Sequence, residues 1–367
     1  MVARVYLHIG LPKTGTTYLQ EILWSHRDEL RAEGIVLPGR GHRDHLWAAL
    51  DIQERPNLAK RHADAPGTWE RLCAELDRES AETGVITHEF FCGATAEQAA
   101  RAVERLAPAE VHVVVTARHA LGMLTAGWQE LVKNGSVITP REAAAPRRRS
   151  EFSWRTWDLG GVLERWGAAV PPEQIHVVTM PGSGAAADEH WVNFSSVLGV
   201  RGEFAPPREA ANSSLGVVQV ELLRRLNADL GDFHSALDRG EWIRGYLAER
   251  HLSAQPAERF GLDEELIDEC RRRSDAALDL LRARAIHVVG DIDSLRVPTT
   301  LPAARSIESV TSEELLSAAS ALVASMLTET RAAAASAPTA SGVSAAESSS
   351  GDGILAGVRR GLMRRKG

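Results

Sequence analysis

The sequence predicts an α/β protein in which a parallel sheet of about five strands is covered by helices on both faces. Short β-branched runs recur through its first half, at 2–9, 34–37, 84–87, 111–116 and 174–179. Most of them are almost continuously apolar rather than alternating, which is typical of parallel strands buried on both faces. Helical patterns lie between these runs, and strands that alternate with helices form three-layer domains with right-handed crossovers.

The helices are predicted from apolar positions that recur on one face. Leu19, Ile22, Leu23 and Leu30 mark the first of them, because residues three or four apart share a helix face. Past residue 200 the pattern is helical almost throughout, so we expect a helical C-terminal part. The other predicted helices span 96–106, 159–166, 217–230, 239–251, 263–285 and 313–331, and a short apolar run at 286–289 leads into Gly290-Asp291.

Changes in composition divide the chain into segments. We expect an α/β domain at 1–300, a helical extension at 301–331, an Ala/Ser-rich linker at 332–352 and a basic tail at 353–367. The linker has few large apolar side chains and is expected to be disordered. In the tail, Ile354, Val358 and Leu362 lie beside a cluster of arginines, a pattern typical of peripheral contact with an anionic membrane. Glycines weaken such a helix, so a merely solvated tail is the alternative.

Composition and charge argue against several classes of protein. A net charge of −7 over 367 residues disfavours a nucleic-acid binder that works through an overall basic field. The three cysteines are widely spaced and odd in number, which disfavours a disulfide framework and suits a reducing compartment. There is no signal-peptide pattern and no run of about 18 apolar residues. A cytoplasmic protein is expected, and its oligomeric state stays open.

Residues 8–20 (HIGLPKTGTTYLQ) join the first predicted strand to the first predicted helix. Gly10 and Gly15 allow a turn whose main-chain N–H groups surround an anion, and the helix N-terminus adds its positive end. Lys13 supplies a charge, and hydroxyls at 14, 16 and 17 can donate to anionic oxygens. The strand, loop and helix together predict an anion-binding loop.

The spacing in this loop differs from that of the nucleotide-kinase loop G-x-x-x-x-G-K-[ST]. Lys13 lies two residues before the second glycine, and Thr16 stands where the kinase loop has its lysine. A kinase lysine follows the β- and γ-phosphates while the next hydroxyl holds Mg²⁺. A lysine inside the turn is instead suited to neutralising the bridging oxygen of a shorter donor.

The run Pro12-Lys13-Thr14-Gly15-Thr16-Thr17 resembles the 5′-phosphosulfate loop of sulfotransferases that use 3′-phosphoadenosine 5′-phosphosulfate (PAPS), particularly their bacterial branch. The resemblance covers roughly the first 295 residues. It implies a P-loop NTPase-like three-layer domain with PAPS as the donor. It also implies that Lys13, Thr14, Thr16 and Thr17 contact the 5′-phosphosulfate and that Gly15 shapes the turn.

A second signature of this family is an arginine at the end of a later strand, which binds the 3′-phosphate of the donor. Arg118 follows the run 111–117 and matches this position. The family has a serine eight residues later, where this chain has Ala126. Thr125 lies about 100° away around a helix and is the candidate replacement for the serine. A helix-capping role is the alternative for Thr125.

The acceptor is expected at the end of the strand 84–87, because ligands bind outside the carboxyl ends of parallel strands. His88 and Glu89 follow this strand, and each is able to take a proton. Thr87-His88 is similar to the Lys-Thr-His of cytosolic sulfotransferases, while other branches use a glutamate base; Ile86 replaces the lysine. Side chains alternate along a regular strand, so we expect only one of the pair to be the base, with His88 preferred. His42, His45 and Trp47 are candidates for a lid over the acceptor.

The resemblance therefore implies transfer of a sulfuryl group from PAPS to a hydroxyl or amine of a carbohydrate, glycolipid or small metabolite, with no metal required. A P-loop kinase is one alternative, for which the run 288–291 could end in a metal-holding Asp291. A nucleotide-binding protein without turnover is the other alternative, because Ala126 and Ile86 depart from the family pattern.

Overall fold

The computed structural model describes residues 1–145, 152–182, 184–204 and 214–336, which divide into two compact units. The first unit consists of Met1–Leu131, Ile138–Asn212 and Leu262–Ala303. The second consists of Val132–Val137, Ser213–Gly261 and the chain from Ala304 onward. The helical region after residue 213 is thus divided between the two units.

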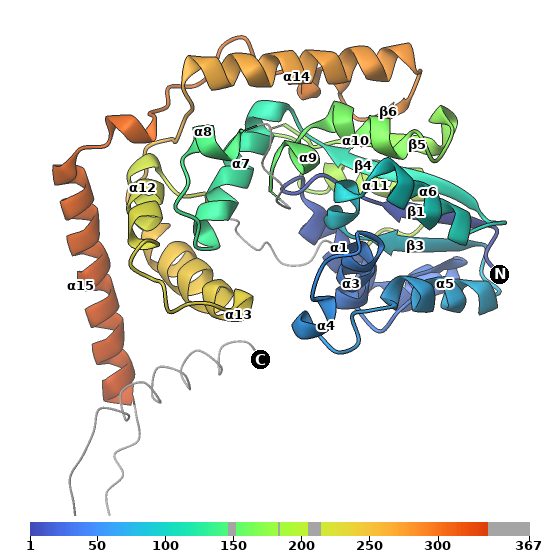
Figure 1. Ribbon diagram of the computed structural model, residues 1–367, viewed down its shortest axis with the longest axis horizontal. Coiled ribbons are helices and arrows are strands. Elements are labelled where there is room, and N and C mark those ends of the chain that lie inside the picture. Colours follow the sequence, from blue (N-terminus) through green and yellow to red (C-terminus); the bar gives the residue numbers. More distant parts are fainter. Residues whose placement is uncertain (146–151, 183, 205–213, 337–367) are drawn as a thin grey trace, which may run out of the picture. The chain divides into compact units, whose positions relative to one another are not determined.

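The first unit contains a sheet of six parallel strands in the order β2-β3-β1-β4-β5-β6 (Figure 1). The strands are β1 (Arg4–His8), β2 (Ile35–Val36), β3 (Thr83–Thr87), β4 (Glu110–Ala117), β5 (Ile175–Thr179) and β6 (His287–Val289). The expected α/β class and parallel sheet are confirmed. The sixth strand is the short apolar run after the predicted helix 263–285, and it pairs only with β5 at the edge of the sheet.

The helical segments of the first unit follow the predicted pattern in part: the predicted first helix is divided at His26 into α1 and α2, and α3 and α5 were not predicted. Leu159–Trp166 is helical as expected, and the predicted helix 96–106 begins with a capping box between Thr95 and Gln98. The segments are α1 (Thr16–Ser25), α2 (Arg27–Ala32), α3 (His42–Ile52), α4 (Leu58–Arg61), α5 (Thr68–Arg78), η1 (Glu89–Gly93), α6 (Ala96–Arg105), α7 (Ala120–Lys133, whose end belongs to the second unit), α8 (Pro140–Ala143), α9 (Trp154–Trp157), α10 (Leu159–Trp166), η2 (Pro172–Gln174), α11 (Glu189–Leu198), α14 (Glu264–Ala283) and η4 (Ile292–Leu295).

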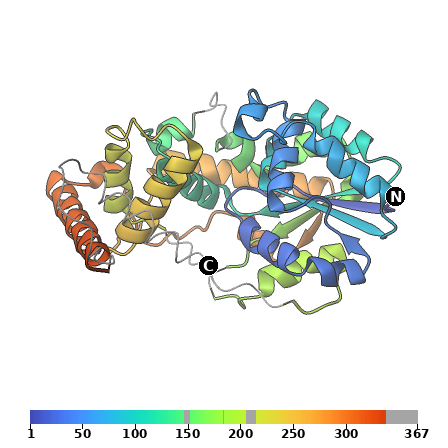
Figure 2. The same cartoon turned by 90° about the horizontal axis from the view of Figure 1, so that it is seen from below.

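Helices cover both faces of the sheet (Figure 2). On one face, Tyr6, Val114 and Val178 pack with Leu23 of α1 and Phe194 of α11 in one apolar cluster. On the other face, α5 lies so close to β3 that a Cβ on Gly84 would be 2.7 Å from a methyl group of Leu76. The near-continuous burial of β1, β3 and β4 follows from this double cover.

The second unit is helical and consists of α12 (Val217–Leu226), α13 (Ala236–Asp238), η3 (Arg239–Leu252), η5 (Ile307–Ser309) and α15 (Ser312–Ser336). Contacts between η3 and α15 include His251 Nδ1 and Ser325 Oγ, which are 2.8 Å apart. Helix α15 continues to Ser336, past its expected end at Arg331. The remainder of the predicted linker and the whole predicted tail lie outside the described residues. Among the described helices, none is both long and apolar enough to cross a membrane.

Candidate active site

The sheet order brings three predicted site segments together at the carboxyl end of the sheet. Strand β1 lies between β3 and β4, and its last residue, His8, pairs with Thr87 and Val114. The anion-binding loop therefore starts beside the end of β3, which His88 and Glu89 follow. It then runs along the last residues of β4, where the N–H of Leu11 donates to the carbonyl oxygen of Thr116 at 2.9 Å, and Arg118 follows β4. This is the point where the strand order reverses, which is the usual place for a ligand in an open parallel sheet.

The loop between β1 and α1 has two residues with left-handed backbone. Gly15 has φ 75°, and Lys13 has φ 67°, which is uncommon for a residue with a side chain. Helix α1 begins at Thr16, and no side chain caps its N-terminus. Its first N–H groups are therefore available to an anion, as the sequence predicts. The Thr17 side chain is exposed in the same turn, whereas Thr16 is buried.

A chain of buried hydrogen bonds joins this loop to the strand ends. Thr14 Oγ1 donates to the carbonyl oxygen of Leu11 at 2.6 Å and lies 2.7 Å from Thr116 Oγ1. His8 Nε2 is 3.2 Å from Thr116 Oγ1, and His8 Nδ1 is 2.8 Å from Thr87 Oγ1. One arrangement satisfies every group: Thr87 donates to His8, His8 to Thr116, Thr116 to Thr14, and Thr14 to Leu11. The Thr14 hydroxyl, expected to donate to the anion, is thus used inside the loop, and the N–H of Thr14 is left for that role.

This arrangement requires a neutral His8. Burial, the largest effect, together with the neighbouring His190 and His88, lowers the pKa of His8 to about 3 despite the charge of Glu89. A neutral imidazole has one donor and one acceptor nitrogen, as the chain of hydrogen bonds requires. His8 is not among the predicted site residues, because it lies inside the predicted strand 2–9.

Both loop glycines lie against other side chains. A Cβ on Gly10 would be 2.7 Å from Thr116 Oγ1, and one on Gly15 would be 2.8 Å from His190 Nε2. His190, in α11, also approaches the carbonyl oxygen of Thr14 at 2.9 Å through Nε2. The loop therefore has no room for side chains at these glycines. His190 is a second loop contact that is not among the predicted site residues.

Lys13 points to α7. Its Nζ is 3.0 Å from Glu130 Oε2, and the Glu130 side chain is buried. The predicted charge of the loop is thus present, but it faces a carboxylate of the protein.

Arg118 lies against the first turn of α7. A Cβ on Gly122 would be 2.3 Å from Arg118 Nε, so the guanidinium rests on the bare glycine. Thr125 follows one turn later and donates its hydroxyl to the carbonyl oxygens of Leu121 at 2.8 Å and Gly122 at 3.2 Å. This hydroxyl is therefore bonded to its own helix and does not cap its start. Neither the expected donation to a 3′-phosphate nor the capping alternative matches this geometry.

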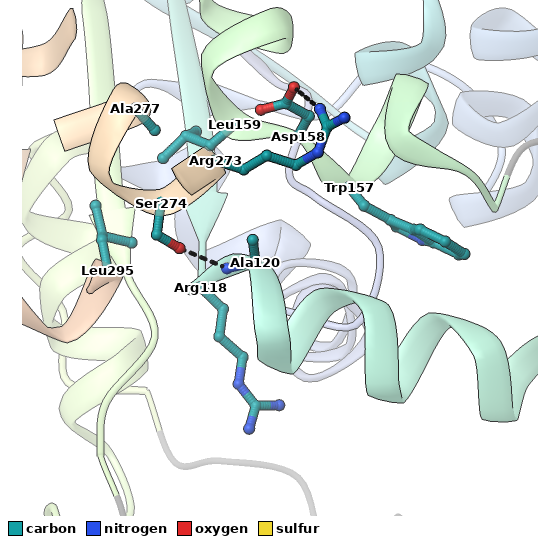
Figure 3. A pocket seen from close by; sticks show the side chains of 9 residues that line it. All are labelled: Arg118, Ala120, Trp157, Asp158, Leu159, Arg273, Ser274, Ala277 and Leu295. Atoms are coloured by element: carbon teal, nitrogen blue, oxygen red, sulfur yellow. Dashed lines mark hydrogen bonds and ion pairs between the residues drawn. The ribbon is translucent and has the colours of Figure 1, made fainter. Parts of the chain in front are cut away.

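Arg118 is one of the residues that line a small pocket (Figure 3). In it, Ser274 Oγ accepts from the N–H of Ala120 at 3.0 Å, and Arg273 pairs with Asp158 at 2.7 Å. The Arg118 side chain extends away from that ion pair. The Ser274–Ala120 bond thus fastens α14 to the start of α7, and the Arg273–Asp158 pair fastens α14 to the start of α10.

His88 and Glu89 are brought together. Strand β3 ends at Thr87 and η1 begins at Glu89, so the expected alternation of the two side chains along a strand does not apply. His88 Nδ1 accepts from the N–H of Phe90 at 3.1 Å and lies 3.7 Å from Glu89 Oε2. Gln20 Nε2 donates to the same Oε2 at 3.1 Å.

The pKa values of this pair are shifted in the same direction. Burial lowers the pKa of His88, and the charge of Glu89 only partly offsets this effect. Burial raises the pKa of Glu89, but His88, the main-chain N–H of Glu89 and the Gln20 amide outweigh it, so the net pKa is lowered. At neutral pH the site therefore holds an ionised Glu89 beside a neutral His88.

Two of the three residues suggested for a lid, His45 and Trp47, make structural contacts, whereas His42 is exposed and its role stays a prediction. Buried His45 bonds to the carbonyl oxygen of Pro38 through Nε2 at 2.8 Å and accepts from the N–H of Thr87 through Nδ1 at 3.0 Å. It thereby holds α3 against β3. Trp47 packs partly buried against Leu50 and Leu58. Nothing in these contacts of His45 and Trp47 supports a lid.

No family model matches the sequence, and no curated protein matches it. Among solved structures, the chain is similar to the sulfotransferase from Alicyclobacillus acidocaldarius, with 18% sequence identity and a TM-score of 0.39. The similar region covers 56% of this chain and 85% of that one.

Proposed function

We propose that this protein is a PAPS-dependent sulfotransferase that transfers a sulfuryl group to a hydroxyl or amine of a small molecule or glycan. One observation carries the proposal. The anion loop with Lys13, Arg118 after one neighbouring strand and Glu89 after the other all follow the carboxyl ends of adjacent strands. These groups match the phosphosulfate, the 3′-phosphate and the acceptor proton in that reaction.

The donor is proposed to lie across the ends of β1 and β4. The N–H groups at Thr14, Gly15 and Thr16, with the Thr17 hydroxyl, would bind the phosphosulfate oxygens. Lys13 would turn from Glu130 to the bridging oxygen, and Arg118 would bind the 3′-phosphate as a charge-assisted fork. Ala126 and Thr125 supply no free hydroxyl donor there, so we assign discrimination of the 3′-phosphate to Arg118.

Glu89 is proposed as the base, in place of the initially preferred His88. The Phe90 N–H donates to His88 Nδ1, so a neutral His88 carries its proton on Nε2. That nitrogen then donates and cannot take a proton from an acceptor. Glu89 is ionised at neutral pH and keeps lone pairs for this purpose. His88 would donate from Nε2 to an oxygen of the acceptor or of the sulfuryl group.

The reaction proposed is an in-line displacement at sulfur. The acceptor oxygen or nitrogen forms a bond to sulfur while its proton passes to Glu89. The bond from sulfur to the bridging oxygen breaks, and its electron pair leaves with adenosine 3′,5′-bisphosphate. Lys13 stabilises the charge that develops on that oxygen, and the N–H groups of the loop hold the equatorial oxygens. A sulfuryl group carries less charge than a phosphoryl group, so no metal is assigned a role.

The position of β6 disfavours the alternative of a P-loop kinase. Asp291, the candidate metal-holding residue, follows β6 at the edge of the sheet, with β4 and β5 between β6 and β1. Neighbouring strands lie about 4.8 Å apart, so β6 is about 14 Å from the loop strand. Asp291 instead accepts from the N–H of Asp293 at 2.9 Å and caps η4.

Two measurements test the proposed function. We expect adenosine 3′,5′-bisphosphate to bind about tenfold or more tightly than AMP in isothermal titration, because an arginine–phosphate pair is lost with AMP. EDTA should leave the affinity unchanged.

We also expect PAPS to be consumed in the presence of a panel of sugars, glycolipids, phenols and amines, and Lys13→Ala to abolish most of this turnover. Equal affinity for the two nucleotides would exclude PAPS as the donor, and nucleotide binding without turnover would support the non-catalytic alternative.

A further inference from the structure

We propose that Gln20 is a positioning residue for Glu89 and joins the donor loop to the acceptor base; the inference rests on the proposed function. Gln20 lies in α1, one turn after Thr16, the first residue of the helix. Its Nε2 donates to Glu89 Oε2 at 3.1 Å. The bond joins two segments separated by 69 residues, the helix that follows the loop and the segment that follows β3.

A glutamine suits this position for a chemical reason. Its amide has one acceptor oxygen and one donor nitrogen, and only the nitrogen is attractive toward a carboxylate. A bond to the ionised form of an acid favours that form. The Glu89 side chain is only 21% exposed, and burial raises its pKa. The bond from Gln20 lowers that pKa and so helps to keep Glu89 ionised.

The contact also gives the two carboxylate oxygens of Glu89 different roles. Oε2 is the atom near both Gln20 Nε2 and His88 Nδ1, at 3.1 and 3.7 Å. We assign Oε1 as the oxygen that takes the proton. Because α1 begins where the loop ends, the helix sets the distance between the phosphosulfate and this base. A change in the first turn of α1 is thus transmitted to Glu89.

The test uses Gln20→Leu, which keeps the bulk and removes the amide, and Gln20→Glu, which adds a like charge. Glu21→Gln, at an exposed neighbouring position on the same helix, is the matched control. We expect the acid limb of the pH–rate profile to move up by about one pH unit in Gln20→Leu and further in Gln20→Glu. The control should leave the limb in place, and the affinity for adenosine 3′,5′-bisphosphate should be unchanged in all three variants.

A titration that needs no turnover separates this inference from the proposed function. The Glu89 carboxyl carbon is followed by NMR in protein labelled with ¹³C-glutamate and is assigned by its loss in Glu89→Gln. A raised Glu89 pKa in Gln20→Leu supports the inference, even if no acceptor is ever sulfated. A Glu89 pKa equal to that of the unchanged protein overturns it, whatever the enzyme turns over.

Discussion

Lys13 combines an uncommon backbone conformation with the positive charge of the loop. It has a left-handed backbone, and its ammonium group faces Glu130. For a residue with a Cβ, this backbone conformation costs about 1–2 kcal/mol, which glycine avoids. The conformation therefore remains because the surrounding loop holds it, and the side chain is retained at a cost in stability.

Comparing Lys13→Ala with Lys13→Gly isolates this cost. Both variants lose the pair with Glu130 and the charge for the donor, so both should lose most turnover. Only glycine relieves the backbone, so we expect Lys13→Gly to be more stable than Lys13→Ala by about 1 kcal/mol. Urea unfolding of the two variants measures the difference. Equal midpoints would mean that the loop relaxes when Lys13 is replaced.

At the scale of elements, the first turn of α7 acts as a support for Arg118. Gly122 has no Cβ where the guanidinium lies, and Thr125 is bonded to the helix main chain. A glycine inside a helix is unfavourable by about 1 kcal/mol relative to alanine. Helix α7 is therefore less stable with Gly122 than it would be with alanine, and the missing Cβ leaves space for the Arg118 guanidinium.

Gly122→Ala should separate stability from nucleotide selectivity. The new Cβ would displace the flexible Arg118 side chain while improving helix propensity, so stability should be unchanged or raised by up to about 1 kcal/mol. Affinity for adenosine 3′,5′-bisphosphate should fall toward that for AMP, and affinity for AMP should stay. Isothermal titration with both nucleotides and a thermal melt provide the measurements. Unchanged selectivity would show that Arg118 does not bind the 3′-phosphate from its position over Gly122.

Only part of the fold and of the candidate site is predictable from the sequence. Continuous apolar runs identified β1, β3, β4 and β5, because burial on both faces removes alternation. Strand β6 is short and lies at the edge, so it was expected only as an apolar run. The loop and the strand ends were found because their residues are adjacent in sequence. His8, Gln20, Glu130 and His190 were missed as site residues, because their roles come from contacts such as Lys13–Glu130, 117 residues apart, which no local pattern encodes.

At the scale of the whole molecule, several histidines of the first unit are held neutral in the folded chain. Burial, the largest effect in each case, lowers the pKa of His8 to about 3 and those of His45, His119 and His176 to about 4. His176 also lies in a row of imidazoles across three strands, 2.9 Å from His112 and 3.0 Å from His287. Protonation of such groups is linked to unfolding.

This linkage predicts acid-sensitive stability. The pKa values of these histidines in the folded chain lie below the ordinary histidine value of about 6.5, so the unfolded chain binds more protons as the pH falls. Full stability is therefore expected above about pH 6.5, with loss between about 6.5 and 4. Fully buried His8 and His45 should each contribute about 1.4 kcal/mol per pH unit in that window. Urea unfolding at several pH values measures the slope, and His176→Gln should reduce it. A stability that is flat from pH 7 to 4.5 would contradict neutral burial of these rings.

The bonds inside the anion loop have a consequence for how quickly a ligand is captured. Thr14 is tied to Leu11 and lies against Thr116, and His190 bonds to the carbonyl oxygen of Thr14. These bonds join groups of the protein itself, so they preorganise the loop, and binding costs little entropy to order it. Association is then governed by diffusional encounter and electrostatic attraction, and not by a slow closing of the loop.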